Sequence, residues 1–306
     1  MTTTYCGFVA ILGAANVGKS TLTNVLTREK VSIISSKPNT TRGRVYGITT
    51  TGDHQVILVD TPGLIMKPQG MLHRYMTKTV WQSGRQADLC LVLVDAHYPC
   101  HDVTQRLLKE LSEKDRRIFL LLNKIDGMKK EALLPLAAGY SSFDKIEKVF
   151  MISGKTGSGL EDLERAIWSA LPEGPWLFPK EALTQLSQKT IAAEITREKL
   201  FECLHQEVPY GIHVETDLWH VPGQDTAPPD LKIPKTGISI FQTIFVEKEG
   251  YRKLILGQKG QRLAHVGKKA REELMQRLGK TVHLFLHIKV SPAWREHSST
   301  YRSFES

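Results

Sequence analysis

The chain has 306 residues, of which 41% are hydrophobic and 24% are charged, and its formal net charge is +9. This composition excludes a fibrous or intrinsically disordered protein, the length predicts about two domains, and the positive charge favours a polyanionic partner. We expect a cytoplasmic protein, because no apolar run approaches the ~20 residues of a membrane-spanning helix and the apolar run at residues 8–12 is too short for a signal peptide.

Short apolar runs alternate with amphipathic segments in the first half of the chain. Buried strands are predicted at residues 8–12, 55–59, 89–94, 118–122 and 148–152. Helical patterns lie between several of these runs, for example at residues 104–111 and 160–171. Apolar strands that alternate with helices predict an α/β domain with a mostly parallel sheet covered on both faces.

The order of elements changes after a proline-rich break at residues 172–179, which carries three prolines and one glycine. We predict a first domain at residues 1–175, a linker at 176–181, a second domain at 182–292 and a tail at 293–306. The second half predicts an α+β domain with the order α-β-β-α-α-β. Its expected elements are a helix at 183–206, strands at 212–221 and 237–247 around a polar loop at 222–234, a helical turn ending near Leu256, a helix at 261–278 and a strand at 282–290.

A phosphate-binding loop follows the first predicted strand. The segment Gly13-Ala14-Ala15-Asn16-Val17-Gly18-Lys19-Ser20 matches GxxxxGK[ST] between a strand and a helix. Its glycines allow a tight turn that points backbone N–H groups at phosphates, and the helix start adds its positive end. Lys19 is expected to reach the β- and γ-phosphates, and Ser20 to ligate Mg²⁺.

The segment Asp60-Thr61-Pro62-Gly63 ends the predicted strand at 55–59. A carboxylate at this edge of a parallel sheet lies beside the phosphate loop, so Asp60 can hold Mg²⁺ through water. Gly63 leaves room for its N–H group to meet the γ-phosphate. The polar segment at 37–42 is predicted to close over that phosphate, with Thr41 rather than Thr40 completing the Mg²⁺ ligands; the alternative is a plain surface turn.

The segment Asn123-Lys124-Ile125-Asp126 follows the fourth predicted strand. The Asp126 carboxylate can accept hydrogen bonds from guanine N1–H and the exocyclic amine, two donors that adenine lacks, so the segment predicts a guanine nucleotide. Lys124 would cover the ring with its stem, and Asn123 would join neighbouring loops. Ser153-Gly154-Lys155 is expected to complete the base pocket.

In the second half, the loop Gly257-Gln258-Lys259-Gly260 lies between two predicted helices. A GxxG loop of this kind lets a nucleic-acid backbone approach closely and clamps about four nucleotides. Seven Lys or Arg occur between residues 252 and 271 with no acid among them, whereas an ordinary solvated helix face would include acids. These features predict RNA binding.

Together these motifs resemble the translation-factor class of P-loop GTPases and, within it, the Era family. The resemblance rests on Asn-Val-Gly-Lys-Ser-Thr, Pro-Asn-Thr-Thr-Arg and Asp-Thr-Pro-Gly in the first half. In the second half it rests on the segments at 193–200, 207–210 and 255–260 and on the closing Lys289-Val290-x-x-x-Trp294-Arg295. It covers nearly the whole chain and implies a G domain followed by a type II KH domain.

The resemblance further implies GTP hydrolysis, binding to the 3′ end of small-subunit ribosomal RNA, a role in 30S assembly and association with the inner membrane in some settings. This chain departs from the family pattern at Ala14-Ala15, where Arg-Pro is usual, at Gly154, where alanine is typical, and at Gln258, where lysine is frequent. None of these changes removes a group that the nucleotide site needs. The change at Gln258 is expected to weaken one phosphate contact.

Two residues bear on the rate of hydrolysis. Leu64 stands where Ras-like enzymes carry a glutamine that orients the attacking water, so we expect slow intrinsic hydrolysis. Asn16 matches the asparagine that ligates K⁺ in related GTPases, and a K⁺ there would stabilise charge as an arginine finger does. The alternative for Asn16 is a hydrogen bond that shapes the loop.

We therefore expect a monomeric GTP hydrolase that uses GTP or GDP, Mg²⁺ and K⁺ and binds ribosomal RNA and the 30S subunit. The alternatives are an RNA chaperone that uses GTP as a latch with negligible turnover, and a GTPase that works at the membrane surface. The predicted catalytic residues are Lys19, Thr41 and Gly63. The predicted nucleotide-binding residues are Gly13, Asn16, Val17, Gly18, Lys19, Ser20, Thr21, Asp60, Thr61, Pro62, Gly63, Asn123, Lys124, Asp126, Ser153, Gly154 and Lys155. The predicted RNA-binding residues are Arg252, Lys253, Gly257, Gln258, Lys259, Gly260, Arg262, Lys268, Lys269 and Arg271.

Overall fold

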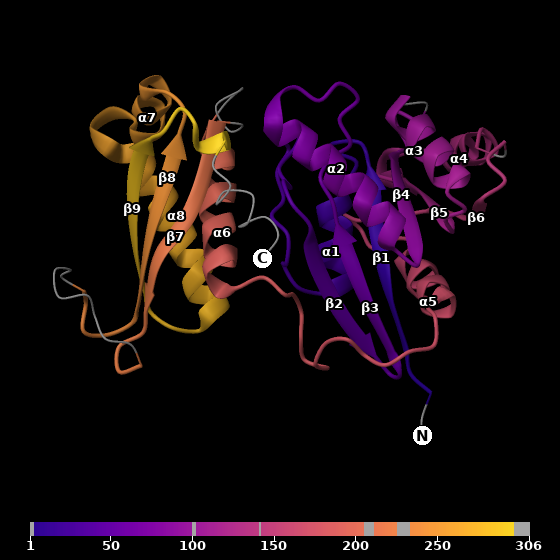
Figure 1. The fold of residues 1–306 in the computed structure, drawn as a ribbon, viewed down its shortest axis with the longest axis horizontal. Coiled ribbons are helices and arrows are strands. Elements are labelled where there is room, and N and C mark those ends of the chain that lie inside the picture. Colours follow the sequence, from indigo (N-terminus) through magenta and orange to yellow (C-terminus); the bar gives the residue numbers. More distant parts are fainter. Residues whose placement is uncertain (1–2, 100–101, 141, 205–210, 225–232, 297–306) are drawn as a thin grey trace. The chain divides into compact units, whose positions relative to one another are not determined.

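A computed structural model describes residues 3–99, 102–140, 142–204, 211–224 and 233–296. The chain forms two compact units, one that extends to Gln185 and one that begins at Leu186 (Figure 1). The segment at 207–210, most of the loop at 222–234 and the tail from residue 297 lie outside the described residues.

The first unit is built on a six-stranded sheet with the order β2-β3-β1-β4-β5-β6. Neighbouring strands are parallel except for β2 and β3, which are antiparallel. The strands are β1 (Tyr5–Gly13), β2 (Val45–Thr51), β3 (His54–Asp60), β4 (Leu89–Asp95), β5 (Ile118–Asn123) and β6 (Ile146–Met151). The predicted mostly parallel sheet is thus confirmed, although the sequence pattern did not reveal β2.

One predicted strand differs in its surroundings. The segment at 148–152 was expected to be buried, but Lys148 and Val149 in β6 are exposed, and Ile152 after it is buried. The expectation was wrong because β6 is an edge strand, which other elements do not cover on all sides. In β1, by contrast, Val9 and Ala10 are both fully buried although they point to opposite faces, so both faces of the central sheet are covered.

The helices of the first unit are α1 (Lys19–Thr27), α2 (Gly70–Gln86), α3 (Asp102–Glu113), α4 (Lys130–Ala138) and α5 (Leu160–Ala170). Each amphipathic helix turns one stripe toward the sheet; in α3 the buried residues include Val103, Leu107 and Leu111, four residues apart. The carboxyl ends of β1, β3, β4 and β5 therefore open into loops at one edge of the sheet, where ligands bind in such folds.

The segment that follows α5 is held against the first unit by hydrogen bonds with one side chain and with the backbone. The buried amide of Gln55 accepts hydrogen bonds from the N–H groups of Leu177 (2.9 Å) and Phe178 (3.0 Å) and donates to the Phe178 carbonyl (2.8 Å). The N–H group of Ile48 in β2 donates to the Leu183 carbonyl at 2.8 Å. These contacts fix the segment at 177–183 on β2 and β3, and Leu183, which was expected to begin a helix, is not helical.

The second unit contains α6 (Gln188–Cys203), β7 (Ile212–His220), β8 (Ile238–Val246), α7 (Glu249–Leu256), α8 (Gln261–Leu278) and β9 (Val282–Val290). This confirms the predicted α-β-β-α-α-β order. Helix α6 begins at Gln188 rather than residue 183, because the Ser187 hydroxyl caps it by accepting a hydrogen bond from the Thr190 N–H group (3.1 Å). The sheet order is β7-β8-β9, with β7 and β8 antiparallel and β8 and β9 parallel.

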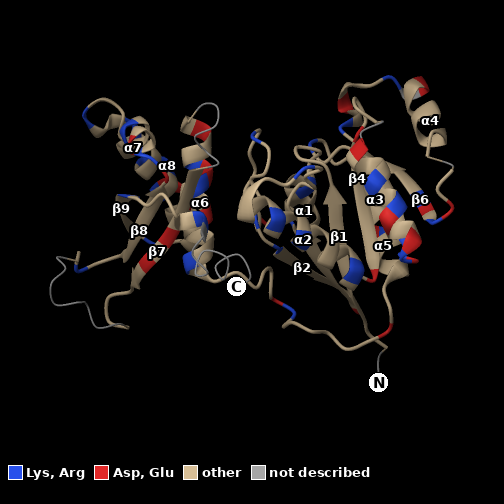
Figure 2. Ribbon diagram, turned by 45° about the horizontal axis from the view of Figure 1, so that its top comes forward, with Lys and Arg blue, Asp and Glu red and all other residues tan. Residues whose placement is uncertain are grey.

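Both signs of charge are interspersed along α3 and α6 (Figure 2). None of the described helices is long and apolar enough to cross a membrane.

Candidate functional site

The loop between β1 and α1 has the backbone of a phosphate cradle. Gly13, Asn16 and Gly18 have φ angles of 153°, 61° and 101°. A Cβ atom on Gly18 would collide with the Asn123 side chain, and one on Gly13 would lie 2.6 Å from the Leu93 carbonyl oxygen. Both positions therefore require glycine, which is why the loop can turn this tightly.

Lys19, the first residue of α1, is buried beneath this loop. Its Nζ donates hydrogen bonds to the carbonyl oxygens of Ala14 (2.7 Å) and Gly13 (3.3 Å). Burial lowers the pKa of Lys19 to about 8, although the nearby Asp60 carboxylate acts in the opposite direction. The loop thus holds a cation that an anionic ligand would stabilise.

Three oxygen-bearing side chains meet next to Lys19. The Ser20 hydroxyl donates to Asp60 Oδ2 at 2.7 Å, the Thr41 hydroxyl donates to the same oxygen at 3.3 Å, and the two hydroxyls lie 3.0 Å apart. The Thr40 hydroxyl instead donates to the Lys37 carbonyl at 2.8 Å. The structure therefore brings together Ser20, Thr41 and Asp60.

The Asp60 carboxylate is fully buried, and its Oδ1 atom accepts no hydrogen bond from any described residue. Burial raises the pKa of Asp60, while the Ser20 hydrogen bond and the Lys19 charge oppose that rise. A carboxylate oxygen and two hydroxyls in one cluster suit Mg²⁺, which prefers oxygen ligands and retains water. The donor set thus fits the predicted metal.

A cavity of about 360 Å³ lies over the phosphate loop. Its walls come from the loop itself, from residues 33–37 and 39–41, and from Thr61 and Gly63 after β3. A Cβ atom on Gly63 would lie 2.8 Å from the backbone nitrogen of Ala15, so this backbone passes very close to the phosphate loop. The Thr61 hydroxyl donates to the Ile11 carbonyl at 2.7 Å and thereby fixes the start of this turn on β1. Of the predicted residues, Asn16, Gly18, Lys19, Ser20, Thr21, Thr41, Thr61, Gly63 and Lys124 line this cavity.

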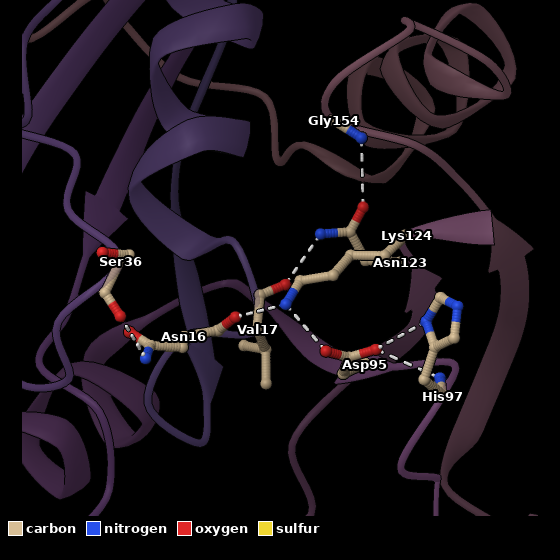
Figure 3. A network of polar contacts seen from close by, with 8 residues as sticks. All are labelled: Asn16, Val17, Ser36, Asp95, His97, Asn123, Lys124 and Gly154. Carbon is tan, nitrogen blue, oxygen red and sulfur yellow. Dashed lines mark hydrogen bonds and ion pairs between the residues drawn. The ribbon is translucent and has the colours of Figure 1, made fainter. Parts of the chain in front are cut away.

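Asn123, at the end of β5, joins the phosphate loop to the loop that follows β6 (Figure 3). Its Nδ2 donates to the Val17 carbonyl at 2.7 Å, and its Oδ1 accepts from the Gly154 N–H group at 3.0 Å. Lys124, with a φ of 68°, reaches across so that its Nζ donates to the Asn16 carbonyl at 2.7 Å. One dipeptide thus connects three loops.

Asp126 is exposed beside these loops. Its Oδ1 accepts a hydrogen bond from the Ser153 hydroxyl at 2.7 Å. That hydrogen bond is the main reason why the pKa of Asp126 is lowered, and the nearby positive charge of Lys155 acts in the same direction. The carboxylate is therefore ionised at neutral pH and can accept hydrogen bonds from a base.

In the second unit, the GxxG loop is a short 3-10 turn, Gln258–Gly260, between α7 and α8. Gly257, Lys259 and Gly260 have φ angles of 68°, 48° and 79°. A Cβ atom on Gly257 would lie 2.8 Å from the Arg262 Cβ atom. The loop is thus a sharp turn, and it brings Lys259 next to the first turn of α8.

The basic residues around this loop fall into two groups. Lys253, Lys259 and Arg271 are exposed and have no acidic partner within 4.0 Å among the described residues. The others have partners, of which Glu202 alone is distant in the sequence. Arg252 pairs with Glu249 (3.3 Å), Lys268 with Glu272 (3.9 Å) and Lys269 with Glu202 (3.4 Å), and Arg262 donates to the Leu254 carbonyl.

Comparison with known proteins relates both units to one family. Residues 8–124 match the family described as 50S ribosome-binding GTPase, and residues 230–295 match the KH domain. GTPase Era of Mesorhizobium japonicum is 41% identical over 299 residues, covering 98% of this chain and 93% of the relative. GTPase Era of Caulobacter vibrioides is 41% identical over 307 residues, covering 96% and 93%. This chain belongs to the Era family of GTPases.

Solved structures of Era agree with that assignment. A crystal structure of Era with MgGDPNP and nucleotides 1506–1542 of 16S ribosomal RNA has a TM-score of 0.89 at 36% identity and covers 98% of both chains. A crystal structure of an Aquifex aeolicus Era variant bound to GDP·AlF4⁻ matches with the same TM-score of 0.89 and 36% identity, also over 98% of both chains. As an Era GTPase, this protein binds guanine nucleotides and hydrolyses GTP.

The structure of this Era chain also adds two residues that the motifs did not reveal. Asp95 ends β4, and its Oδ2 accepts a hydrogen bond from Lys124 Nζ at 2.7 Å (Figure 3). Its Oδ1 accepts from the His97 N–H group at 3.1 Å and lies 3.2 Å from His97 Nδ1. Burial alone would raise the pKa of Asp95, but the hydrogen bonds from Lys124 and His97 outweigh it, and the pKa is lowered. The available signal was position, because Asp95 closes an apolar strand just as Asp60 and Asn123 do.

Leu64 follows the turn at Gly63, and its side chain is buried in the core of the first unit. Its N–H group donates to the Gly13 carbonyl at 3.2 Å. The residue in the position of the Ras glutamine therefore packs inward and offers no polar atom to a water in the cavity.

Proposed function

We propose that this Era GTPase couples GTP binding and hydrolysis to binding of the 3′ end of small-subunit ribosomal RNA during assembly of the 30S subunit. The observation that carries the proposal is the union, in one chain, of the loop at 13–20 with the GxxG turn between α7 and α8. The solved Era complex with MgGDPNP holds a fragment of 16S ribosomal RNA, and this supports the small subunit as partner.

In the nucleotide site, we assign the phosphates to the backbone N–H groups of residues 13–20 and to the Lys19 ammonium. Lys19 would neutralise the β- and γ-phosphates, while the N–H group of Gly63 and the closing segment at Thr41 would position the γ-phosphate. The close approach of Gly63 to Ala15 supports this role, because it brings both loops to one side of the cavity.

Mg²⁺ would be held by the Ser20 and Thr41 hydroxyls and, through water, by the Asp60 carboxylate. When bound, Mg²⁺ neutralises charge on the phosphate oxygens during transfer to water. The geometry of the three side chains and the Asp60 Oδ1 atom without a hydrogen-bond donor among the described residues support this assignment.

We assign guanine recognition to Asp126, with Lys124 covering the ring and Ser153, Gly154 and Lys155 closing the pocket. The Ser153 hydroxyl fixes one oxygen of the Asp126 carboxylate, so the group is preorganised to accept the two guanine donors. Asn123 and Val17 act indirectly by holding the base loops on the phosphate loop.

We expect slow intrinsic hydrolysis, because the buried Leu64 side chain cannot orient water. We also propose K⁺ as an activating ion at Asn16. The Nδ2 atom of Asn16 donates to the Ser36 carbonyl at 2.9 Å, so the Oδ1 atom is the one that would ligate the ion. Equal turnover in Na⁺ and K⁺ buffers would contradict this assignment and leave the hydrogen bond to Ser36 as the role of Asn16.

For RNA, we assign the backbone clamp to Gly257, Gln258, Lys259 and Gly260. The exposed Lys253, Lys259 and Arg271 would bind phosphates directly. Arg252, Arg262, Lys268 and Lys269 would exchange the protein partners described above for phosphates.

The proposal is tested by single-turnover GTP hydrolysis with and without 30S particles. We expect 30S particles to accelerate hydrolysis by the intact protein. The double variant Gly257→Asp/Gly260→Asp should lose RNA binding and the acceleration but keep GDP affinity, because its changes lie in the second unit. Binding to 30S without any acceleration would favour the RNA chaperone with a GTP latch, and unchanged RNA affinity of the variant would contradict the KH assignment.

We further propose that the protein acts as a cytoplasmic monomer that also meets the inner membrane peripherally, as the family resemblance implies. Flotation with vesicles that contain anionic lipid tests the membrane contact, and light scattering tests the monomer.

A further inference from the structure

Asp95 ends β4 with a carboxylate to which the proposed function gives no role. Its side chain is only 15% exposed. Strands β4 and β5 are parallel neighbours, and Asp95 is paired in register with Asn123, the residue before Lys124. The pairing of the two strands therefore places this carboxylate beside the start of the segment that we assign to guanine.

Both oxygens of the Asp95 carboxylate accept hydrogen bonds (Figure 3). Oδ2 accepts from Lys124 Nζ at 2.7 Å, and Oδ1 accepts from the His97 N–H group at 3.1 Å. The backbone donor holds the carboxylate in one orientation, in which Oδ2 is directed at Lys124. Exposed ion pairs contribute little because the pair alone must hold two mobile side chains. In this pair, one partner is already fixed by the backbone.

The ammonium group of Lys124 is shared between two loops. Its Nζ donates to the Asn16 carbonyl of the phosphate loop and to Asp95 Oδ2, both at 2.7 Å. The Lys124 stem must therefore span from the end of β5 to the phosphate loop, and Lys124 lines the cavity over that loop. A long side chain loses rotamer freedom when it is fixed in this way, and the ion pair with Asp95 offsets that cost.

The sign of its charge shows that Asp95 is not a direct contact for the nucleotide. A carboxylate beside the phosphate loop repels an anionic ligand, and Asp95 is not among the residues that line the cavity, whereas Lys124 is. Asp95 can therefore favour a nucleotide only through Lys124.

We propose that Asp95 is a positioning residue for guanine, which holds the Lys124 ammonium at the phosphate loop so that the Lys124 stem lies in place for the base before the nucleotide arrives. The inference rests on the proposed assignment of Lys124 to the guanine ring. A side chain that is fixed in advance lowers the entropic cost of binding, which is how preorganisation raises affinity.

The test is a double-mutant cycle of Asp95 and Lys124, read as the GDP affinity of the full chain with Mg²⁺. We expect Asp95→Asn to weaken GDP binding about fivefold, the upper value for a partly exposed ion pair, because the amide offers one oxygen to two donors and carries no charge. Charge alone predicts the opposite sign, since the loss of an acid beside an anionic ligand tightens binding. In the Lys124→Ala background, where no stem remains to be positioned, Asp95→Asn should no longer weaken GDP binding.

Two further variants complete the comparison. Asp95→Glu keeps the carboxylate, and the flexible Lys124 stem can follow it, so wild-type affinity should be retained. The matched control is Asp115→Asn, which removes the aspartate of an exposed ion pair with Lys145 in the same unit and should leave GDP affinity unchanged. Thermal unfolding shows whether each variant remains folded, and Asp95→Ser replaces Asp95→Asn in the cycle if the amide variant does not fold.

The inference is overturned if Asp95→Asn binds GDP as tightly as the wild type or more tightly, if it weakens binding equally in the Lys124→Ala background, or if Asp95→Glu is weakened as much as Asp95→Asn. Failure of the proposed assignment gives a different result, because Lys124→Ala itself would then bind GDP with wild-type affinity.

Discussion

At the scale of single residues, Lys19 gives the nucleotide site a pH dependence. Its pKa is lowered to about 8 without ligand, and bound phosphates would raise that pKa because they favour the charged form. Binding above pH 8 therefore takes up a proton. We predict that GDP affinity is constant below about pH 8 and then falls by up to about tenfold per pH unit.

The measurement is a nucleotide titration between about pH 7 and pH 9 at constant ionic strength, which keeps screening of the phosphates fixed. Guanine also loses its N1 proton in alkaline solution. The control is therefore Lys19→Ala, because the pH dependence that remains in its weaker nucleotide binding comes from the base alone. Identical pH profiles for the two proteins would show that Lys19 does not take up a proton when the nucleotide binds.

Single residues also show which parts of the site the sequence motifs could predict. The positions of Ser20, Thr41 and Asp60 could be expected from the sequence because each belongs to a short segment with known spacing to a strand end. His97 could not, because it carries no local pattern. Asp95 was marked only by its place at the end of an apolar strand, and Lys124 meets it only once β4 and β5 are paired. The partner of Lys269 was hidden for a similar reason, because Glu202 lies on another helix, whereas Glu249 is three residues before Arg252 on the same helix and could have been expected.

At the scale of elements, strongly patterned segments were predictable and weakly patterned ones were not. The apolar strands β1, β4 and β5 follow from composition alone. Strand β2 is half polar, with Thr49, Thr50 and Thr51 at its end, and forms because β3 offers an antiparallel edge. Helix α2 has no acid in its first turn and no side-chain cap, so no start signal marks it in the sequence.

The short turn Trp294–Glu296 after β9 depends on one side chain. The Trp294 ring is 1% exposed, stacks on His213 with a centroid distance of 5.5 Å, and donates from Nε1 to the Gly211 carbonyl at 3.2 Å. We predict that Trp294→Ala destabilises the second unit by about 3–5 kcal/mol, through loss of buried aromatic surface and the cavity that remains. Urea unfolding followed by far-UV circular dichroism measures the change.

Trp294→Phe is the matched variant, because it keeps a stacking ring and loses the hydrogen bond to Gly211. Its destabilisation should stay near 1 kcal/mol, about the usual net value of one hydrogen bond. If both variants unfold like the wild type, the turn is not anchored by this residue.

At the scale of the whole molecule, the two units have separate hydrophobic cores. One core collects residues from β1 to α5, and the clusters of the second unit draw only on residues from Ala192 onward. A ligand that binds only the first unit therefore stabilises only that unit directly, and unfolding of such a protein need not be a single two-state event.

We predict two calorimetric transitions that respond differently to nucleotide. GDP with Mg²⁺ at about 100 times Kd should stabilise the first unit by about 2.7 kcal/mol and leave the second transition in place. Lys19→Ala identifies the nucleotide-dependent transition, because in this variant the shift that GDP causes in that transition should largely disappear at the same GDP concentration. Trp294→Ala identifies the other, since it should lower only the second unit's transition. A single transition that moves as a whole with GDP would show instead that the units unfold together, so that nucleotide binding at the phosphate loop also stabilises the RNA-binding unit.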